Sequence, residues 1–304
     1  MKKIIVRFFL VIISVFVLIT LLIAAIFFSV NKTNGEIESS GQTRKYLLYI
    51  PETYDPAAPT PLIISMHGFV EWPAHQMEIS HWNDLADEFG FIIVYPSGTG
   101  FPLRWHTYDQ PDTDISPLHE VRFISDLIDK LESKYNIDKT RIYANGLSNG
   151  AGMSFVLACK LSERITAIGG VSGAYLLPWS DCKPSRPMPV ILFHGTDDPI
   201  VPYLGGESNR SDYQFPVIPE WISVWAERNE CDDAALELPS NGEVSGIKYT
   251  NCEQDADVIL YTIQGGGHAW PGGEPLPEFI VGHTTQDIDS SGVMWEFFDQ
   301  YSLE

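Results

Sequence analysis

The chain contains 304 residues, 44% of them hydrophobic and 19% charged, and its formal net charge is −21 at pH 7. A chain of this length can bury one sizeable core, and α/β folds of this size are routinely single domains. The negative charge repels nucleic acids and anionic membrane surfaces, which excludes them as charge-matched partners. It also disfavours acidic ligands at long range and leaves neutral small molecules open.

The N-terminus has the pattern of a membrane-directed segment. It carries three basic residues, Lys2, Lys3 and Arg7. The run 8–30 that follows contains no charged residue, and at about 1.5 Å per helical residue it reaches the hydrocarbon thickness of about 30 Å. The positive flank predicts that the N-terminus lies inside the cell and the rest outside. We therefore expect residues 1–30 to be a retained transmembrane anchor, with a signal peptide cleaved near Ala25 as the alternative.

Strand-like apolar runs alternate with helical patterns along the rest of the chain. The strand-like runs are 46–50, 61–66, 91–95, 141–145, 166–171, 189–194 and 257–263. The helical patterns are 121–134, 149–161, 216–228 and 291–301. This alternation predicts an α/β fold with a mostly parallel central sheet and helices on both faces, whose ligand site lies at the carboxyl ends of the strands. We assign 31–43 to a short linker and 44–304 to the folded domain.

The segment Gly146-Leu147-Ser148-Asn149-Gly150 reads G-x-S-x-G between the strand-like run 141–145 and the helical pattern 149–161. A serine hydroxyl is a poor nucleophile, and the nucleophile elbow exposes it on a strained strand-to-helix turn. Only small flanking residues avoid collision there, and glycine stands at both ends. A plain Gly/Ser turn entering a helix is the alternative for this motif taken alone.

Two later loops supply the partners that a nucleophilic serine needs. The apolar run 189–194 leads to Asp197 and Asp198, and a glycine-rich loop, 265–273, carries His268. The order Ser, Asp, His is the order of α/β-hydrolases. His268 would take the proton from Ser148, while a buried aspartate fixes the imidazole tautomer. The residues alone leave the choice between Asp197 and Asp198 open.

Acyl transfer also requires amide donors that face the developing oxyanion. The residue after the nucleophile, Asn149, supplies one backbone N–H. The segment 61–70 reads as a strand followed by a His-Gly turn, so the N–H of Phe69 is the second expected donor and Val70 the alternative. The side chain of His67 is either a substrate contact or a packed loop histidine.

The chain resembles the polyhydroxybutyrate depolymerase and feruloyl esterase group of extracellular α/β-hydrolase serine esterases. The resemblance extends over roughly residues 44–301 and rests on the segments 61–70, 91–96, 141–159, 194–203 and 265–272. It implies that the catalytic acid is the aspartate two residues after His-Gly-Thr, which is Asp198. Dedicated polymer depolymerases usually add a linker and a substrate-binding domain, and this sequence shows neither, which favours smaller esters.

The four cysteines, Cys159, Cys182, Cys231 and Cys252, form an even set without metal-ligand spacing. Three pairings are possible. Nearness in sequence and the family resemblance favour Cys159 with Cys182 and Cys231 with Cys252. Disulfides would agree with a location outside the cytoplasm, whereas free buried thiols would indicate a cytosolic enzyme.

Signatures for bound cofactors are missing from the sequence. Gly98-Thr99-Gly100 lacks a third spaced glycine, and His119-Glu120 lacks the second histidine of a zinc motif. We therefore expect no cofactor and no metal. Aromatic rings in loops beside the site could stack on a sugar or a phenolic acid, and we choose Trp105 and Trp270, with His67, as candidate substrate-binding residues.

Together these features predict an extracytoplasmic serine carboxylesterase that forms an acyl-enzyme on Ser148. Small, phenolic-acid or carbohydrate-linked esters are the expected substrates. Peptide hydrolysis and depolymerisation of a polyhydroxyalkanoate or another polyester are the enzymatic alternatives. The alternative from another class is a non-catalytic, membrane-tethered binding protein that keeps the fold, since a fold alone does not establish a function.

Overall fold

The computed structural model describes residue 13 and residues 32–109, 114–208 and 211–304. Apart from Ile13, the predicted N-terminal span 8–30 lies outside the described residues. Across the described ranges, no helix is both long and apolar enough to cross a membrane.

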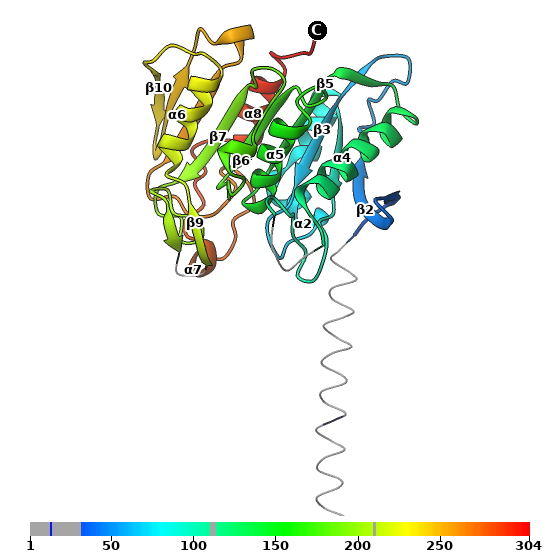
Figure 1. The fold of residues 1–304 in the computed structure, drawn as a ribbon, viewed down its shortest axis with the longest axis horizontal. Coiled ribbons are helices and arrows are strands. Elements are labelled where there is room, and N and C mark those ends of the chain that lie inside the picture. Colours follow the sequence, from blue (N-terminus) through cyan, green and yellow to red (C-terminus); the bar gives the residue numbers. More distant parts are fainter. Residues whose placement is uncertain (1–12, 14–31, 110–113, 209–210) are drawn as a thin grey trace, which may run out of the picture.

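The centre of the fold is a ten-stranded sheet with the order β1-β2-β4-β3-β5-β6-β7-β12-β11-β10 (Figure 1). The six central strands from β4 to β12 run parallel, and both edges are antiparallel. In this spatial order the strands are β1 (Gly35–Ser39), β2 (Gln42–Tyr49), β4 (Ile92–Pro96), β3 (Thr60–Met66), β5 (Ile137–Gly146), β6 (Ala167–Val171), β7 (Val190–Gly195), β12 (Val258–Ile263), β11 (Val244–Tyr249) and β10 (Leu236–Asn241). Two short strands, β8 (Gly206–Ser208) and β9 (Ser211–Phe215), form a separate ribbon.

Helices cover both faces of the sheet, as the sequence predicts. One face packs against α4 (Pro117–Glu132), α5 (Asn149–Lys160) and α6 (Ile218–Arg228), which lie in front of the sheet in Figure 1. The other packs against α2 (Pro73–Ser80), α3 (Trp82–Phe89) and α8 (Ser290–Phe298). A short helix, α7 (Glu278–Val281), and two 3₁₀ turns, Trp179–Asp181 and Glu253–Asp255, complete the described elements.

The double covering explains why the central strands read as continuous apolar runs. Every residue of β3 is buried. Within it, Leu62 and Ile64 join the core under α4 to α6, while Ile63 joins the core under α8. Successive side chains of a strand point to opposite faces, so a strand between two layers of helices must be apolar at nearly every position.

The sheet begins earlier than we predicted. Residues 35–43, assigned above to the linker 31–43, form β1, the turn after it and the start of β2. The segment Gly35–Ser39 alternates exposed and partly buried positions because it is an edge strand. Such a polar edge strand has no apolar run that would separate it from a linker in the sequence.

Both predicted disulfides are present, Cys159–Cys182 and Cys231–Cys252. The first joins the end of α5 to the 3₁₀ turn at Trp179–Asp181, and the second joins the segment after α6 to the loop before β12. Each closes a loop of just over twenty residues. Loops of this size are worth about 3 kcal/mol each in the loop-entropy model.

Candidate active site

Ser148 occupies a strained turn between β5 and α5. Its φ is 55° and its ψ is −115°, a left-handed conformation that residues other than glycine rarely adopt. The turn is held on both sides, because the Ser148 N–H donates to the Val171 carbonyl at 2.8 Å and the Ser148 carbonyl accepts from Gly152 at 3.0 Å. The Ser148 side chain therefore lies at the carboxyl edge of the parallel sheet.

The two glycines of the motif are required by the neighbouring strand β3. A Cβ atom at Gly146 would lie 2.5 Å from the Met66 carbonyl oxygen, and one at Gly150 would lie 2.1 Å from the same oxygen. Both distances are far below a van der Waals contact. The G-x-S-x-G pattern thus reflects how closely β3 passes the elbow, in addition to the strain at Ser148.

Asp198 and His268 meet in the loops after β7 and β12. His268 Nδ1 lies 2.8 Å from Asp198 Oδ2, and both residues are buried, each with 6% of its surface exposed. Asp198 Oδ1 accepts the backbone N–H groups of Ile200 and Val201, each at 2.8 Å. Asp197, the alternative that the sequence left open, is exposed and does not contact His268 in the described part of the chain. The geometry thus favours Asp198 as the partner of the histidine.

The surroundings of Asp198 keep its carboxylate ionised. Burial raises its pKa, but the charge and hydrogen bond of His268, the nearby His194 and the N–H of Val201 outweigh burial and hold the pKa below its usual value. An ionised carboxylate accepts a hydrogen bond from Nδ1–H of His268. The Nε2 atom is then the basic nitrogen of that ring.

A second histidine, His194, also lies against the acid and was not singled out from the sequence. Its Nε2 lies 3.4 Å from Asp198 Oδ2 and 2.9 Å from the Val201 carbonyl oxygen. The shorter distance assigns its N–H to Val201, and burial lowers the pKa of His194, so that the ring stays neutral. Its position four residues before Asp198 at the end of a buried strand was the available signal.

The two expected oxyanion donors remain accessible as donors. Among the described residues, the N–H groups of Asn149 and Phe69 make no hydrogen bond. The N–H of Val70, the alternative donor, is already engaged, because it donates to the Leu103 carbonyl at 2.9 Å. A Cβ atom placed on Gly68 would be 3.5 Å from Ser148 Cβ, so the loop that carries Phe69 runs directly beside the nucleophile.

His67 and Trp105, which we predicted to contact substrate, both have buried side chains, with 0% and 2% exposure. His67 Nε2 accepts the Gly98 N–H at 3.0 Å, and Nδ1 lies 2.7 Å from the Gly68 carbonyl oxygen. Burial lowers the pKa of His67 to about 4, which keeps it neutral. Trp105 donates its indole N–H to the His67 carbonyl. Both rings fix the loops behind the site.

Trp270, the third predicted substrate contact, is also buried, with 1% of its surface exposed. Its indole N–H donates to Ser291 Oγ at 2.9 Å, which ties the His268 loop to the start of α8. The sequence placed Trp270 correctly in this loop but could not show that its ring turns inward. Its role here is to anchor the loop.

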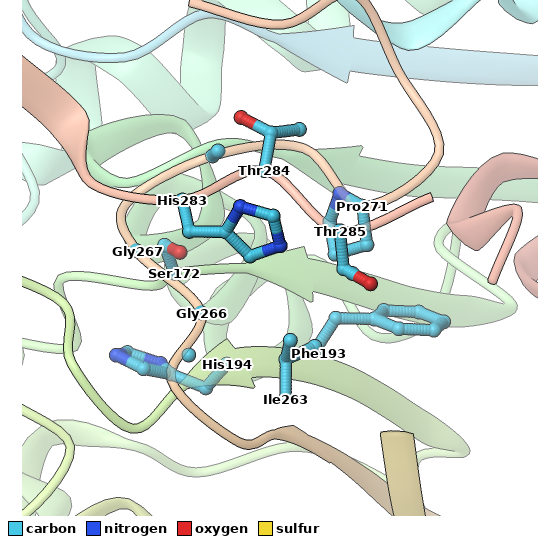
Figure 2. A pocket seen from close by; sticks show the side chains of 12 residues that line it. Ser172, Phe193, His194, Ile263, Gly266, Gly267, Pro271, His283, Thr284 and Thr285 are labelled. Atoms are coloured by element: carbon cyan, nitrogen blue, oxygen red, sulfur yellow. The ribbon is translucent and has the colours of Figure 1, made fainter. Parts of the chain in front are cut away.

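A small cavity lies beneath the His268 loop (Figure 2). Phe193 and His194 line it from β7, and the stretch 283–285 lines it from the opposite side. Its volume of about 10 Å³ accommodates about one water-sized sphere, which is far too small for an ester. A more open hollow of about 410 Å³ lies against β2 and Tyr135, away from Ser148. Neither of these two hollows is lined by Ser148.

Across the described ranges, no group of three or more His, Cys, Asp and Glu residues is arranged to hold a metal ion. What the described site contains is a strained serine, a hydrogen-bonded carboxylate–imidazole pair and two backbone donors.

This architecture is shared with known proteins. Residues 105–214 match a family described as phospholipase/carboxylesterase. The fold is similar to the solved acetyl xylan esterase from Aspergillus awamori, with a TM-score of 0.61 and 15% identity over 87% of this chain and 98% of that one. The chain has the α/β-hydrolase fold. Its mostly parallel sheet, predicted from the sequence, belongs to that fold.

Two relatives extend the similarity to sequence. A bifunctional acetylxylan esterase/xylanase of Neocallimastix patriciarum is 26% identical over 276 residues, which is 89% of this chain and 35% of that protein. Feruloyl esterase B of Piromyces equi is 28% identical over 270 residues, which is 86% of this chain and 46% of that protein. The chain therefore spans between about a third and a half of the length of these relatives. The resemblance to feruloyl esterases seen in the motifs is confirmed.

Proposed function

We propose that this α/β-hydrolase is a serine carboxylesterase whose catalytic triad is Ser148, His268 and Asp198. The observation that carries the proposal is the 2.8 Å contact between His268 and the buried Asp198, at the sheet edge where Ser148 stands on a strained elbow. β5, β6, β7 and β12 are neighbouring parallel strands, so the loops that follow them meet at one edge. A nucleophile, a base and an orienting acid at one edge are the parts of an acyl-transfer site.

In this mechanism His268 Nε2 takes the proton from Ser148 Oγ as the oxygen attacks the ester carbonyl. The backbone N–H groups of Asn149 and Phe69 stabilise the oxyanion of the tetrahedral intermediate. Collapse breaks the ester bond, and the proton on His268 passes to the leaving alcohol. A water molecule, activated by the same histidine, then hydrolyses the acyl-enzyme and restores Ser148.

Small, phenolic-acid or carbohydrate-linked esters are the substrates we propose. The names of the relatives, acetylxylan esterase and feruloyl esterase, support this class. A small apolar cluster packs beside both the nucleophile and the acid: the Ala174 N–H donates to the Ser148 carbonyl at 3.0 Å, and the Val201 N–H donates to Asp198. The buried members of this cluster are Ala174, Val201 and Phe215, with Leu176 and Ile200 packed against them.

One observation keeps polyester depolymerisation as a second candidate. Several loops at the carboxyl edge expose large apolar side chains, with exposures of 51% for Phe69, 91% for Phe101 and 85% for Phe279. Phe69 follows β3, and Phe101 follows β4. Phe279 lies in α7, whose last residue, Val281, accepts the His268 N–H through its carbonyl. Exposed apolar rings around an entrance can adsorb to a hydrophobic solid.

We also propose that the catalytic domain, 44–304 together with the β1 edge strand, lies outside the cytoplasm. The basic flank and apolar run of residues 1–30 and the two disulfides support this location. The full-length protein is expected to fractionate with membranes and to lose its catalytic domain to protease added outside intact cells. Complete protection of the domain in intact cells would contradict the proposal.

The deciding assay measures hydrolysis of p-nitrophenyl acetate, methyl ferulate, acetylated xylan and a polyhydroxybutyrate suspension by the purified full chain, with Ser148→Ala as the control. We expect turnover of the small esters that disappears in the control. Clearing of the polymer with negligible turnover of the small esters would favour the depolymerase. A folded protein without turnover of any ester would favour the non-catalytic binding protein.

A further inference from the structure

The loop that carries the predicted oxyanion donor Phe69 is closed by a side chain. Glu71 Oε2 accepts the Gly68 N–H at 2.8 Å, and the Glu71 N–H returns to the Gly68 carbonyl at 3.3 Å. Val70 between them has a φ of 69°, a left-handed conformation that is unfavourable for a β-branched residue. The turn from Gly68 to Glu71 therefore contains a strained residue, and the Glu71 carboxylate holds the turn closed through the Gly68 N–H.

The turn has little freedom beside the nucleophile. A Cβ atom placed on Gly68 would be 2.9 Å from Glu71 Oε2 and 3.5 Å from Ser148 Cβ, so the carboxylate, the turn and the nucleophile pack together. The Val70 N–H is fixed to the Leu103 carbonyl at 2.9 Å. With Gly68 and Val70 both held, the Phe69 N–H between them is the amide left for a ligand, as far as the described residues show.

A histidine of α2 lies beside the carboxylate of Glu71. His75, one helical turn further on, places Nδ1 3.5 Å from Glu71 Oε1, while the Glu71 side chain is only 20% exposed. Burial raises the pKa of Glu71, but the contact with His75 and the Gly68 N–H outweigh burial and keep the pKa below its usual value. The turn is thus closed by an ionised group, whose hydrogen bonds are stronger than those of a neutral one.

We propose that Glu71 is a positioning residue for the oxyanion site: its carboxylate fixes the 68–71 turn so that the Phe69 N–H stays directed at the oxyanion formed on the ester bound at Ser148. The inference rests on the proposed esterase function. Glu71 carries no proton to donate and acts through Phe69. Because the oxyanion exists only in the transition state and the intermediate, loss of this support lowers kcat and leaves KM nearly unchanged.

The test compares two variants of similar size in the full chain. Glu71→Gln keeps an oxygen that accepts the Gly68 N–H, whereas Glu71→Met keeps the length of the side chain and removes the acceptor. Glu71→Ala is measured alongside, so that a poor fit of methionine does not decide the result. The exposed Glu88 on α3 supplies the matched controls, Glu88→Gln and Glu88→Met.

We expect kcat for p-nitrophenyl acetate to fall about 30- to 100-fold in Glu71→Met and Glu71→Ala, since misplacing one oxyanion donor has effects of this order. KM should change by less than about threefold, and Glu71→Gln should recover kcat to within about threefold of wild type. The affinity for a phenylboronic acid inhibitor, whose adduct with Ser148 mimics the intermediate, should fall in parallel with kcat/KM. Both Glu88 variants should match the wild type.

Three results would overturn the inference. Glu71→Met and Glu71→Ala could each keep more than about a third of wild-type kcat. Glu71→Gln could be as impaired as Glu71→Met, which would show that the acceptor is not what matters. KM could rise with kcat unchanged, which would make Glu71 a substrate contact. Inactivity of the wild type and the Glu88 variants is a different result, because it would overturn the proposed function and this inference with it.

Discussion

The nucleophile elbow and the His268 loop are built in different ways. The elbow, 146–150, is fixed by contacts with adjacent strands, with the Leu147 N–H bonded to Met66 and the Ser148 N–H to Val171. The His268 loop is fixed in part by the loop after β7, where the Gly265 N–H donates to Thr196 Oγ1 and the Asp197 N–H donates to the Gly266 carbonyl, and in part by chain that follows it in sequence. Its backbone N–H groups at 267, 268 and 272 donate to the carbonyls of residues 283, 281 and 285.

Because of this difference, the two regions should tolerate different substitutions. The elbow fits between buried strands, so its shape depends on the absence of two side chains. The His268 loop depends on a second segment, 281–285, and on the anchor Trp270 against α8. We therefore expect a side chain added in the elbow to act through collision with β3, and loss of Trp270 or of the contacts with 281–285 to act through lost support of the His268 loop.

The largest effect on kcat should come from removing the residue that gives up the proton or the residue that accepts it, although one lies in the elbow and the other in the His268 loop. Ser148→Ala and His268→Ala should each lower kcat by about 10⁶, because members of a triad act as one unit. Turnover of p-nitrophenyl acetate by the purified variants measures the loss, and circular dichroism checks folding. Retention of more than about a tenth of wild-type turnover by a folded Ser148→Ala would contradict the mechanism.

The next effect distinguishes the two adjacent aspartates. Asp198→Asn should lower kcat by about 10⁴, because the amide favours the wrong tautomer of His268. Asp197→Asn should change kcat by less than about threefold, since Asp197 is exposed and its side chain contacts Thr196 instead. The same ester assay compares the two variants directly. The reverse ranking would transfer the role of the acid to Asp197.

The central strands could be predicted from the sequence, whereas the edge strands could not. Strands β3, β4, β6, β7 and β12 and the second half of β5 are largely buried, so their apolar runs are visible in the sequence. The antiparallel edges are different. β10 is exposed along most of its length, and β1 alternates between partly buried and exposed positions. An edge strand is defined by its pairing with a neighbour, and pairing leaves no trace in the composition of such a segment.

Prediction of the site from the sequence is limited in a similar way, because the loops could be identified but the directions of their side chains could not. Ser148 and His268 stand out because glycines surround them, and glycine occurs where an added side chain would collide, as at Gly150, or where φ is positive, as at Gly265. Whether an aromatic ring faces a substrate or the core depends on rotamers and on distant partners, such as Ser291 for Trp270. For that reason the sequence identified the loops of the site but chose buried rings as substrate contacts.

A pair of glycine substitutions tests the contrast through stability. Gly150→Ala should destabilise the fold by about 3 kcal/mol or more, because its Cβ would lie 2.1 Å from the Met66 carbonyl oxygen. Gly265→Ala should cost only about 1 kcal/mol, since Gly265 has open space around it and the cost arises from its φ of 74°. Urea unfolding of both variants gives the two free energies. Equal losses would show that the close approach of β3 does not constrain the elbow.

The smallest effect concerns the anchor of the His268 loop. Trp270→Phe removes the indole N–H that donates to Ser291 Oγ and should lower the free energy of unfolding by about 1 kcal/mol, the usual worth of such a bond. Ser291 Oγ still donates to the Ser80 carbonyl, so the start of α8 remains tied to the end of α2. KM for methyl ferulate should stay within about threefold of wild type, because the ring is buried. A tenfold rise in KM at unchanged stability would instead make Trp270 a substrate contact, and would mean that the loop turns its ring outward when an ester binds.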